Sequence, residues 1–357
     1  MVRIVIDARK LGDFGIGEYI KQLLLAFRDL ARSDQVFFLH AKDRPPAFAM
    51  PAHFHPVPVA VPRYSMQEFF LLGRHINRLR PQVVHIPHYT APLSVRAPLL
   101  CTIHDLIHLH MMDVVYTPAH RWYAHTVLRY AVKRAQRIIA VSQATRRDLV
   151  RFFPACANKL AVVHNGVEAQ PAGATGKRPT APTADYYLYV GNCKAHKNLI
   201  NLIRAYEIYR QEAGQPARLV LAGVASNPDW PWLKKYLSRY TAWQNIDTTG
   251  FLPRSRLFSL YRGCRALCLV SMHEGFGLPA LEAASQQRPV IASKPSPMQE
   301  FLQQNVLWVN PFSIRQIADA FHRVPEMEAE PAGAPAALCW QSTAEKTYAL
   351  YREAVHG

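Results

Sequence analysis

The chain has 357 residues, of which half are hydrophobic, and it carries a formal net charge of +17. This length favours two domains of ordinary size over a single core, and this apolar content excludes a largely disordered chain. The positive charge leaves three kinds of partner open, namely nucleic acid, an anionic membrane surface or small phosphorylated ligands.

The first half of the chain alternates short apolar runs with stretches of helical spacing. Apolar runs rich in β-branched residues are typical of buried parallel strands, and they predict strands at 2–8, 35–40, 83–86, 99–105, 137–142 and 160–167. Apolar residues at intervals of three and four indicate amphipathic helices, which are predicted at 17–33, 66–79 and 119–135.

A second alternation follows residues 171–184, a segment of prolines and small residues without a large apolar side chain. This composition predicts a linker. Beyond it, strands are predicted at 186–191, 218–223, 246–250, 266–271 and 289–293. Helices are predicted at 198–213, 231–239 and 254–262, and a further helix from about 279.

Strands that alternate with helices predict a parallel sheet with helices on both faces, and the pattern occurs twice here. We therefore expect an α/β fold with an N-terminal domain over 1–170 and a C-terminal domain over 185–335, joined by the linker at 171–184. Ligands bind outside the carboxyl ends of the strands in such sheets, so two domains that face each other create a binding cleft. The last segment, 336–357, is predicted to include a helix that packs back on the N-terminal domain.

The segment "SMHEGFGLPALEA", residues 271–283, places two glutamates eight positions apart around two glycines and a proline. Pro279 suits the first turn of a helix because its missing N–H would be unpaired there, so a helix is predicted to begin near Leu278. Glu274 is then expected on the loop and Glu282 in the first helical turn. The exposed N–H groups of a helix N-terminus favour an anion, and glycines let a phosphate approach the backbone closely.

Two carboxylates on either side of an anion site fit a ligand that has hydroxyls at both ends of its phosphates. A nucleotide sugar has this layout, with Glu274 accepting from the sugar and Glu282 from the ribose. A structural alternative stays open, in which Glu282 only complements the helix dipole and Glu274 caps the loop. The acid and base of a glycosidase are another alternative, although glycoside hydrolases need no phosphate site between their carboxylates.

The motif "HEGFGLPALEA" resembles the glutamate, seven residues, glutamate motif of retaining glycosyltransferases of family 4. Those enzymes have the GT-B fold, in which two Rossmann-like domains with parallel sheets face each other across a cleft. Further segments agree in order and spacing, namely "GIGEY" (15–19), "TIHDLIHL" (102–109), "RIIAVSQATRRDL" (137–149), "VVHNGV" (162–167), "YVGNCKAHKNL" (189–199), "LVLAG" (219–223), "TGFLPRSRLFSLYRGC" (249–264) and "NPFSIRQIADAF" (310–321). The likeness covers nearly the whole chain and is strongest to the branch that builds bacterial surface polysaccharides, often with mannose or related sugars.

The resemblance implies roles for individual residues. Lys197 matches the lysine that binds the donor diphosphate, and its compact positive charge suits a departing diphosphate. Glu274 would hold sugar hydroxyls, and His104 matches a histidine of the N-terminal domain that approaches the donor sugar. His104, Lys197 and Glu274 are therefore the predicted catalytic residues. Contacts to the donor are predicted for Gly15, Gly17, Gly191, Asn192, Lys197, Gly275, Phe276, Gly277, Leu278 and Glu282.

One predicted donor contact departs from the family pattern. Many relatives carry an arginine directly after the glycine at the place where this chain has Asn192, so a second phosphate-binding cation is missing there. Lys194 and His196 are the candidates to replace it.

Two other chemistries are weighed against the resemblance. Gly15 and Gly17 match a first-domain loop that closes toward the diphosphate, and a dehydrogenase fingerprint is disfavoured because no third glycine follows at Ile20. The histidine-rich segments "HIPH" and "HDLIHLH" lack a convincing set of cysteine or carboxylate partners. No metal site is therefore predicted.

We expect a metal-independent retaining glycosyltransferase that moves a hexose, with mannose favoured, from a GDP- or UDP-linked sugar to a glycan or polyprenyl-diphosphate-linked acceptor. No cofactor is expected besides this donor substrate. The N-terminal domain would bind the acceptor, and its basic helical stretches at 63–80 and 121–137 make an anionic membrane surface a further candidate partner.

No cleavable signal segment and no run of 18 apolar residues is found, so we expect a cytoplasmic location with peripheral contact at the inner face of the plasma membrane. Two alternatives remain open, a basic two-domain protein that binds nucleic acid and another GT-B sugar-nucleotide enzyme such as an epimerase. No nucleic-acid-binding signature supports the former, so nucleic acid is not expected among the partners.

Overall fold

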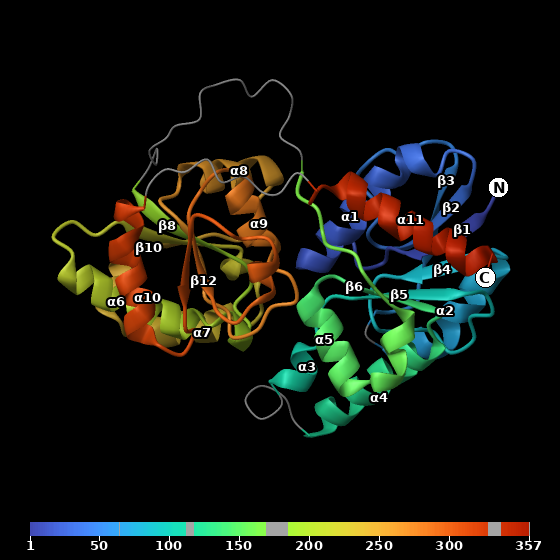
Figure 1. The fold of residues 1–357 in the computed structure, drawn as a ribbon, viewed down its shortest axis with the longest axis horizontal. Helices are drawn as coiled ribbons and strands as arrows, with labels where there is room; N and C mark the ends of the chain where they lie inside the picture. Colours follow the sequence, from blue (N-terminus) through green and yellow to red (C-terminus); the bar gives the residue numbers. More distant parts are fainter. Residues whose placement is uncertain (64, 112–117, 169–184, 328–336, 357) are drawn as a thin grey trace. The chain divides into compact units, whose positions relative to one another are not determined.

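The computed structural model describes residues 1–63, 65–111, 118–168, 185–327 and 337–356 (Figure 1). The chain divides into two compact units. Unit 1 comprises Met1–Gly166 together with Ala337–Gly357, and unit 2 comprises Val167–Ala336. The predicted linker at 171–184 lies outside the described residues.

Unit 1 is built on a parallel sheet of seven strands in the order β3-β2-β1-β4-β5-β6-β7. The strands are β1 (Arg3–Asp7), β2 (Gln35–Ala41), β3 (Phe54–Val59), β4 (Val83–Ile86), β5 (Leu99–Ile103), β6 (Arg137–Ala140) and β7 (Leu160–Val162). The parallel α/β sheet predicted from the alternation is confirmed. Its order reverses between β1 and β4, which is the point where ligands bind in open α/β sheets.

Helices cover both faces of this sheet. They are α1 (Phe14–Leu30), α2 (Met66–Arg78), α3 (Ile107–His110), α4 (Pro118–Arg134), α5 (Gln143–Phe152) and α11 (Trp340–His356). Val84 and Ile86 of β4 point into a core that includes Leu72 of α2 and Leu128 of α4. His85, between them, points to the opposite face, where its ring lies 5.5 Å from that of Tyr351 on α11.

The C-terminal helix α11 packs against α1 within unit 1, and the two helices lie side by side in Figure 1. The rings of Phe27 on α1 and Tyr351 on α11 lie 5.5 Å apart. Tyr348, one turn earlier on α11, donates a hydrogen bond from its hydroxyl to the Asp34 carboxylate. The last helix is therefore held in unit 1 by both apolar and polar contacts.

Strand β3 was not predicted, because its sequence "FHPVPV" contains two prolines. Proline cannot donate to a sheet, so it is normally confined to edge strands. β3 is the edge strand of the seven, where Pro56 lies opposite Phe38 of β2. At the edge of the sheet, prolines without an N–H group are tolerated.

Unit 2 is built on a second parallel sheet, of six strands in the order β10-β9-β8-β11-β12-β13. The strands are β8 (Tyr186–Val190), β9 (Arg218–Ala222), β10 (Ile246–Thr248), β11 (Leu267–Leu269), β12 (Val290–Ser293) and β13 (Val306–Val309). The helices are α6 (Leu199–Glu212), α7 (Trp230–Leu237), α8 (Arg254–Gly263), α9 (Leu278–Ser285) and α10 (Ile314–Arg323). Strand β13 and helix α10 extend the predicted alternation by one further repeat.

Candidate functional site

The predicted donor segment lies where β11 gives way to α9 at the carboxyl edge of the unit 2 sheet. The helix begins at Leu278, as predicted, with Pro279 in its first turn. Gly277 precedes it with a φ of +94°, a conformation that side chains with a Cβ rarely adopt. A Cβ at this position would also lie 2.6 Å from the Cγ of Met298. The turn that opens α9 therefore requires glycine.

Glu274 lies on the loop before α9, as predicted, and it is paired with Lys197. The Lys197 ammonium donates to Glu274 Oε1 at 2.7 Å, and the Ser271 hydroxyl donates to the same oxygen at 2.7 Å. Burial alone would raise the pKa of Glu274, but the charge of Lys197 and these two hydrogen bonds outweigh it and hold that pKa below its ordinary value. Two predicted catalytic residues are thus in direct contact and form an ion pair.

Backbone geometry brings Lys197 to this loop. Lys197 ends a short 3₁₀ helix, η2 (Ala195–Lys197), and Asn198 after it adopts the left-handed conformation that asparagine tolerates before α6 begins. The Asn198 amide donates to the carbonyl oxygens of Val270 at 3.0 Å and of Pro311 at 2.7 Å. The Met272 N–H donates to the His196 carbonyl at 2.8 Å. These bonds tie η2 to the loop that carries Glu274.

Glu282 lies in the second turn of α9 and not in the first, because Leu278 is the first helical residue and Glu282 the fifth. It is buried, and each of its oxygens has a partner from α8. Arg254 Nη1 donates to Oε1 at 2.8 Å, and the Tyr261 hydroxyl donates to Oε2 at 2.7 Å. Burial and the adjacent carboxylate raise the pKa of Tyr261 well above its ordinary value, so this phenol stays a donor.

Arg254 and Tyr261 are polar partners that the sequence prediction missed. Both lie in the quoted segment "TGFLPRSRLFSLYRGC", seven residues apart and hence on one face of α8. Arg254 also donates to Glu168 Oε2, from Nε at 3.2 Å and from Nη2 at 3.1 Å. The guanidinium therefore bridges two carboxylates, Glu168 and Glu282. The seven-residue spacing places Arg254 and Tyr261 on one face of α8, but it does not indicate which carboxylate they meet.

The loop after β8 contains two more predicted contacts of unit 2, Gly191 and Asn192. A Cβ on Gly191 would lie 2.7 Å from the hydroxyl of Tyr189, which donates to the Asn192 carbonyl at 2.5 Å. The Asn192 side chain accepts from the backbone N–H of Lys194 at 3.2 Å. The Lys194 side chain is exposed and His196 is buried. The side-chain oxygen of Asn192 thus closes its own turn.

Two further predicted contacts, Gly275 and Phe276, lie on the loop before α9. The Phe276 side chain is buried, with its ring 4.9 Å from that of Phe301. Its side chain packs in the core of unit 2, so only the backbone of Phe276 is suited to contact a ligand at the loop. Gly275 before it is also buried.

His104 lies in unit 1, directly after β5. Its Nε2 lies 3.1 Å from the carbonyl oxygen of Pro87, which can only accept, so Nε2 carries the proton and Nδ1 is an acceptor. Burial lowers the pKa of His104 to about 4, so the ring is neutral at pH 7. The ring of Tyr19 meets that of His104 edge to face at 4.9 Å.

Gly15 and Gly17 lie in the first turns of α1 and not in a loop, because the helix begins at Phe14, earlier than predicted. The two glycines differ in their surroundings. A Cβ on Gly17 would lie 2.4 Å from the carbonyl oxygen of Leu11, whereas a Cβ on Gly15 would meet nothing within 4 Å. Packing explains Gly17, but it leaves Gly15 without a structural reason.

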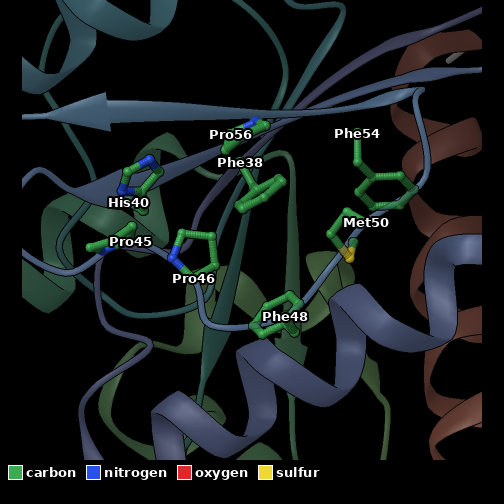
Figure 2. Close-up of a pocket in the computed structure, with 8 residues that line it drawn as sticks. All are labelled: Phe38, His40, Pro45, Pro46, Phe48, Met50, Phe54 and Pro56. Atoms are coloured by element: carbon green, nitrogen blue, oxygen red, sulfur yellow. The ribbon is translucent and has the colours of Figure 1, made fainter.

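Two hollows lie at the β2–β3 edge of unit 1. One, of about 310 Å³, is walled by β2, β3 and the segment between them (Figure 2). It is lined by Phe38, His40, Pro45, Pro46, Phe48, Met50, Phe54 and Pro56. This apolar lining does not suit a diphosphate. The other, of about 580 Å³, adjoins the carboxyl ends of β2 and β3 and includes Lys42, Asp43 and Arg63.

Comparison with known proteins gives a match for each half of the chain. The family model described as Glycosyltransferase Family 4 matches residues 15–170, and the model described as Glycosyl transferases group 1 matches residues 176–334. The O-antigen chain mannosyltransferase RfbU of Salmonella typhimurium is 23% identical over 345 residues, which cover 91% of this chain and 91% of that protein. The chain spans 42% of the length of a serotype-specific mannosyltransferase of Escherichia coli that it also matches.

Solved structures share the fold over the full chain. A sucrose-phosphate synthase from Thermosynechococcus elongatus superposes with a TM-score of 0.78 at 18% identity, covering 99% of each chain. Anabaena Alr3699/HepE in complex with UDP-glucose has a TM-score of 0.69 at 18% identity, covering all of this chain and 97% of that one. The two-domain Rossmann-like architecture expected from the sequence is confirmed by these likenesses.

Proposed function

Because the chain belongs to the glycosyltransferases, with a family 4 half followed by a group 1 half, we propose that it is a retaining hexosyltransferase. The donor is a GDP- or UDP-linked sugar, with mannose favoured, and the acceptor is a glycan or a polyprenyl-diphosphate-linked oligosaccharide of a surface polysaccharide. The name of RfbU supports mannose and an O-antigen product. The complex of Alr3699/HepE with UDP-glucose supports a nucleotide sugar as donor.

The observation that carries the proposal is the contact of Lys197 with Glu274, at 2.7 Å, beside the N-terminus of α9. A lysine ammonium and the positive end of a helix dipole both attract phosphate. The neighbouring carboxylate accepts hydrogen bonds from hydroxyls. A ligand that joins a diphosphate to a sugar satisfies both kinds of group at once.

Glu282 is proposed to bind the ribose of the donor. Arg254 and Tyr261 each use one bond to a Glu282 oxygen, and an ionised carboxylate has about four acceptor positions. In the proposed complex a ribose diol donates to the same carboxylate. Arg254 and Tyr261 would then act as positioning residues that fix the carboxylate.

In the proposed reaction the bond between the sugar C1 and the diphosphate oxygen breaks, and its electron pair leaves with the diphosphate. Lys197 and the positive end of the α9 dipole stabilise the charge that develops there. The acceptor hydroxyl bonds to C1 on the same face and gives its proton to an oxygen of the leaving phosphate. We expect EDTA to leave the rate unchanged, and a loss of activity restored by a divalent ion would contradict this metal-independent scheme.

His104 is proposed to contact the donor sugar as a neutral acceptor. Its Nε2–H is held by Pro87 and its pKa is lowered to about 4 by burial. A sugar hydroxyl can therefore donate to Nδ1 over the whole physiological pH range. The acceptor is proposed to bind unit 1, where the 580 Å³ hollow with Lys42 and Arg63 opens at the carboxyl end of the sheet.

We also propose that unit 1 contacts an anionic membrane surface peripherally, from the cytoplasmic side. No helix in the described ranges combines the length and apolarity needed to span a bilayer. Large exposed apolar side chains nonetheless gather on α2, on α4 and on the segment beside them, namely Met66, Phe70, Leu71, Leu93, Trp122 and Tyr123. Exposed cations accompany them on the same helices, namely Arg74, Arg78, Arg129 and Lys133.

Contacts between these elements make them one surface. The Leu93 N–H donates to the Phe69 carbonyl at 2.9 Å, and the rings of Phe69 and Tyr123 lie 6.4 Å apart. An apolar patch flanked by cations fits a lipid surface that carries negative charge. Co-sedimentation with vesicles that contain phosphatidylglycerol should fall for Trp122→Ser and not for Trp232→Ser, a matched exposed tryptophan of unit 2. Equal binding of the wild type to neutral vesicles would contradict the proposal.

The donor site is tested by thermal denaturation with UDP, GDP, ADP and dTDP sugars, followed by transfer assays with the stabilising donor. We expect one nucleotide to raise the melting temperature and Lys197→Ala to weaken that shift. Lys235→Ala, on the exposed face of α7, is the matched control. Lys194→Ala tests whether the exposed Lys194 side chain supplies the positive charge that is missing because Asn192 stands where many relatives have an arginine. If no nucleotide stabilises the wild type, the proposed donor site is wrong.

A further inference from the structure

Two motifs that lie far apart in the sequence meet inside unit 1. Tyr19 is the last residue of "GIGEY", and His104 belongs to "TIHDLIHL". Their rings meet edge to face with centroids 4.9 Å apart and an interplanar angle of 81°. Such pairs are favourable and directional. Tyr19 is fully buried, so it cannot contact a ligand itself, and the proposed reaction gives it no role.

The hydroxyl of Tyr19 is anchored to β5, the strand that directly precedes His104. It lies 3.1 Å from Thr102 Oγ1. Thr102 is the fourth residue of β5 (Leu99–Ile103), and His104 follows this strand directly. Tyr19 is therefore held by β5 at its hydroxyl and touches His104 with its ring.

A buried polar chain extends this anchor to the C-terminal helix. Thr102 Oγ1 lies 2.7 Å from His85 Nε2, and His85 Nδ1 lies 2.6 Å from the Tyr351 hydroxyl on α11. Burial lowers the pKa of His85 to about 3, so its ring is neutral. A neutral imidazole offers one donor and one acceptor, and both are used here. The chain links α11, β4, β5 and α1.

Helix α11 also reaches Tyr19 at its other end. The ring of Trp340, the first residue of α11, lies 6.0 Å from that of Tyr19. The start of α11 packs against Gly166, where a Cβ would lie 2.1 Å from the Trp340 nitrogen. The Thr343 hydroxyl donates to the His164 carbonyl at 2.8 Å. Residues 162–167, the quoted segment "VVHNGV", thus hold the start of α11 in place. Helix α11 in turn contacts Tyr19.

We propose that Tyr19 is a positioning residue for His104 and that α11 sets the place of Tyr19 through Trp340 and Tyr351. The inference rests on the proposed contact of His104 with the donor sugar. Pro87 holds one nitrogen of the imidazole, and Tyr19 limits the rotation of the ring about that bond. A shift of about 1 Å in a reacting contact can cost about 100-fold in rate. Helix α11 therefore influences turnover through Tyr19 and His104, without contacting the sugar itself.

The test combines ring-nitrogen NMR with kinetics. Protein labelled with ¹⁵N-histidine reports the tautomer and ring environment of His104, whose signals are assigned with His104→Gln. We expect a single Nε2–H tautomer in the wild type. Tyr19→Leu should displace these signals and lower kcat by about 10- to 100-fold, with the KM for the donor changed much less. Tyr19→Phe keeps the ring but removes the last hydroxyl of the polar chain, so it should shift the His104 signals and lower kcat less than Tyr19→Leu does. This milder variant guards against a failure of Tyr19→Leu to fold.

A matched pair on α11 separates positioning from general stability. Tyr351→Phe breaks the polar chain to Tyr19, whereas Tyr348→Phe removes a hydroxyl from the same helix that bonds Asp34 instead. We expect the His104 signals to shift for Tyr351→Phe and to stay in place for Tyr348→Phe. The proposal is overturned if Tyr19→Leu leaves the His104 signals unchanged, or if both α11 variants act alike. If no donor supports transfer, the proposed function fails, yet the NMR spectra still decide the positioning.

Discussion

The ammonium of Lys197 has a carboxylate partner, Glu274, whose Oε1 lies 2.7 Å away. A diphosphate that uses Lys197 must therefore share it with Glu274 and tolerate a negative charge nearby. In the proposed donor site we expect the pair to bind a nucleotide sugar, whose hydroxyls engage Glu274, better than a bare nucleoside diphosphate. We therefore expect the pair to favour release of the product diphosphate.

Glu274→Gln tests whether Lys197 binds the diphosphate while Glu274 binds the sugar hydroxyls. Removing the negative charge should tighten binding of the nucleoside diphosphate about 3- to 10-fold, since one Coulomb interaction of about 1 kcal/mol is relieved. Turnover should fall about 100-fold because a charged acceptor for the sugar hydroxyls is lost. Calorimetric titration and transfer rates measure the two effects. A parallel loss of binding and turnover would contradict the assigned role of Glu274.

Glu282→Ala should weaken the nucleoside diphosphate about 10- to 100-fold, because hydrogen bonds to a charged acceptor contribute about 1.5 to 3 kcal/mol. Inorganic pyrophosphate has no ribose, so its affinity should be unchanged by Glu282→Ala and reduced by Lys197→Ala. Competition binding with pyrophosphate distinguishes the two sites. If Glu282→Ala weakens pyrophosphate as much as the nucleotide, Glu282 does not bind the ribose.

The start of α9 was predictable from local chemistry, since Pro279 in the first turn and a glycine before it restrict the backbone strongly. The partners of Glu282 were not predictable in the same way. Arg254 and Tyr261 come from another helix, and which side chains meet depends on how α8 and α9 pack. Likewise, the prolines of β3 argue locally against a strand, and only the sheet order reveals the edge position that tolerates them.

The two glycines of α1 should respond to substitution in opposite ways. Gly17→Ala places a Cβ 2.4 Å from a backbone carbonyl, so we expect a loss of about 1 to 3 kcal/mol in the free energy of unfolding. Gly15→Ala has open space, and alanine in a helix should add about 0.5 to 1 kcal/mol. Urea denaturation measures both.

The donor affinity and turnover of Gly15→Ala then test the prediction that Gly15 contacts the donor. A stable variant with reduced donor affinity would show that a ligand needs close approach at Gly15. Unchanged affinity and turnover would remove Gly15 from the donor site and leave it as an ordinary helical residue.

His85 makes the stability of unit 1 depend on pH. Its pKa is lowered by burial from an ordinary value of 6.5 to about 3 in the folded protein. Below pH 6.5 the unfolded chain binds a proton at this ring that the folded chain does not, so stability must fall as the pH decreases. The expected slope is about 1 kcal/mol per pH unit for this histidine between pH 6 and pH 5.

Urea denaturation at several pH values measures this slope in the wild type and in two variants. His85→Gln removes the titrating ring, so the variant should be less stable at pH 7.5 but should lose less stability than the wild type as the pH falls. His356→Gln, exposed at the end of α11, should keep the wild-type slope. His104, with its pKa lowered to about 4, contributes in the same direction, so some slope should survive in His85→Gln. A slope identical in all three proteins would mean that His85 is not buried in its neutral form, and the polar chain from α11 to Tyr19 would lose its central link.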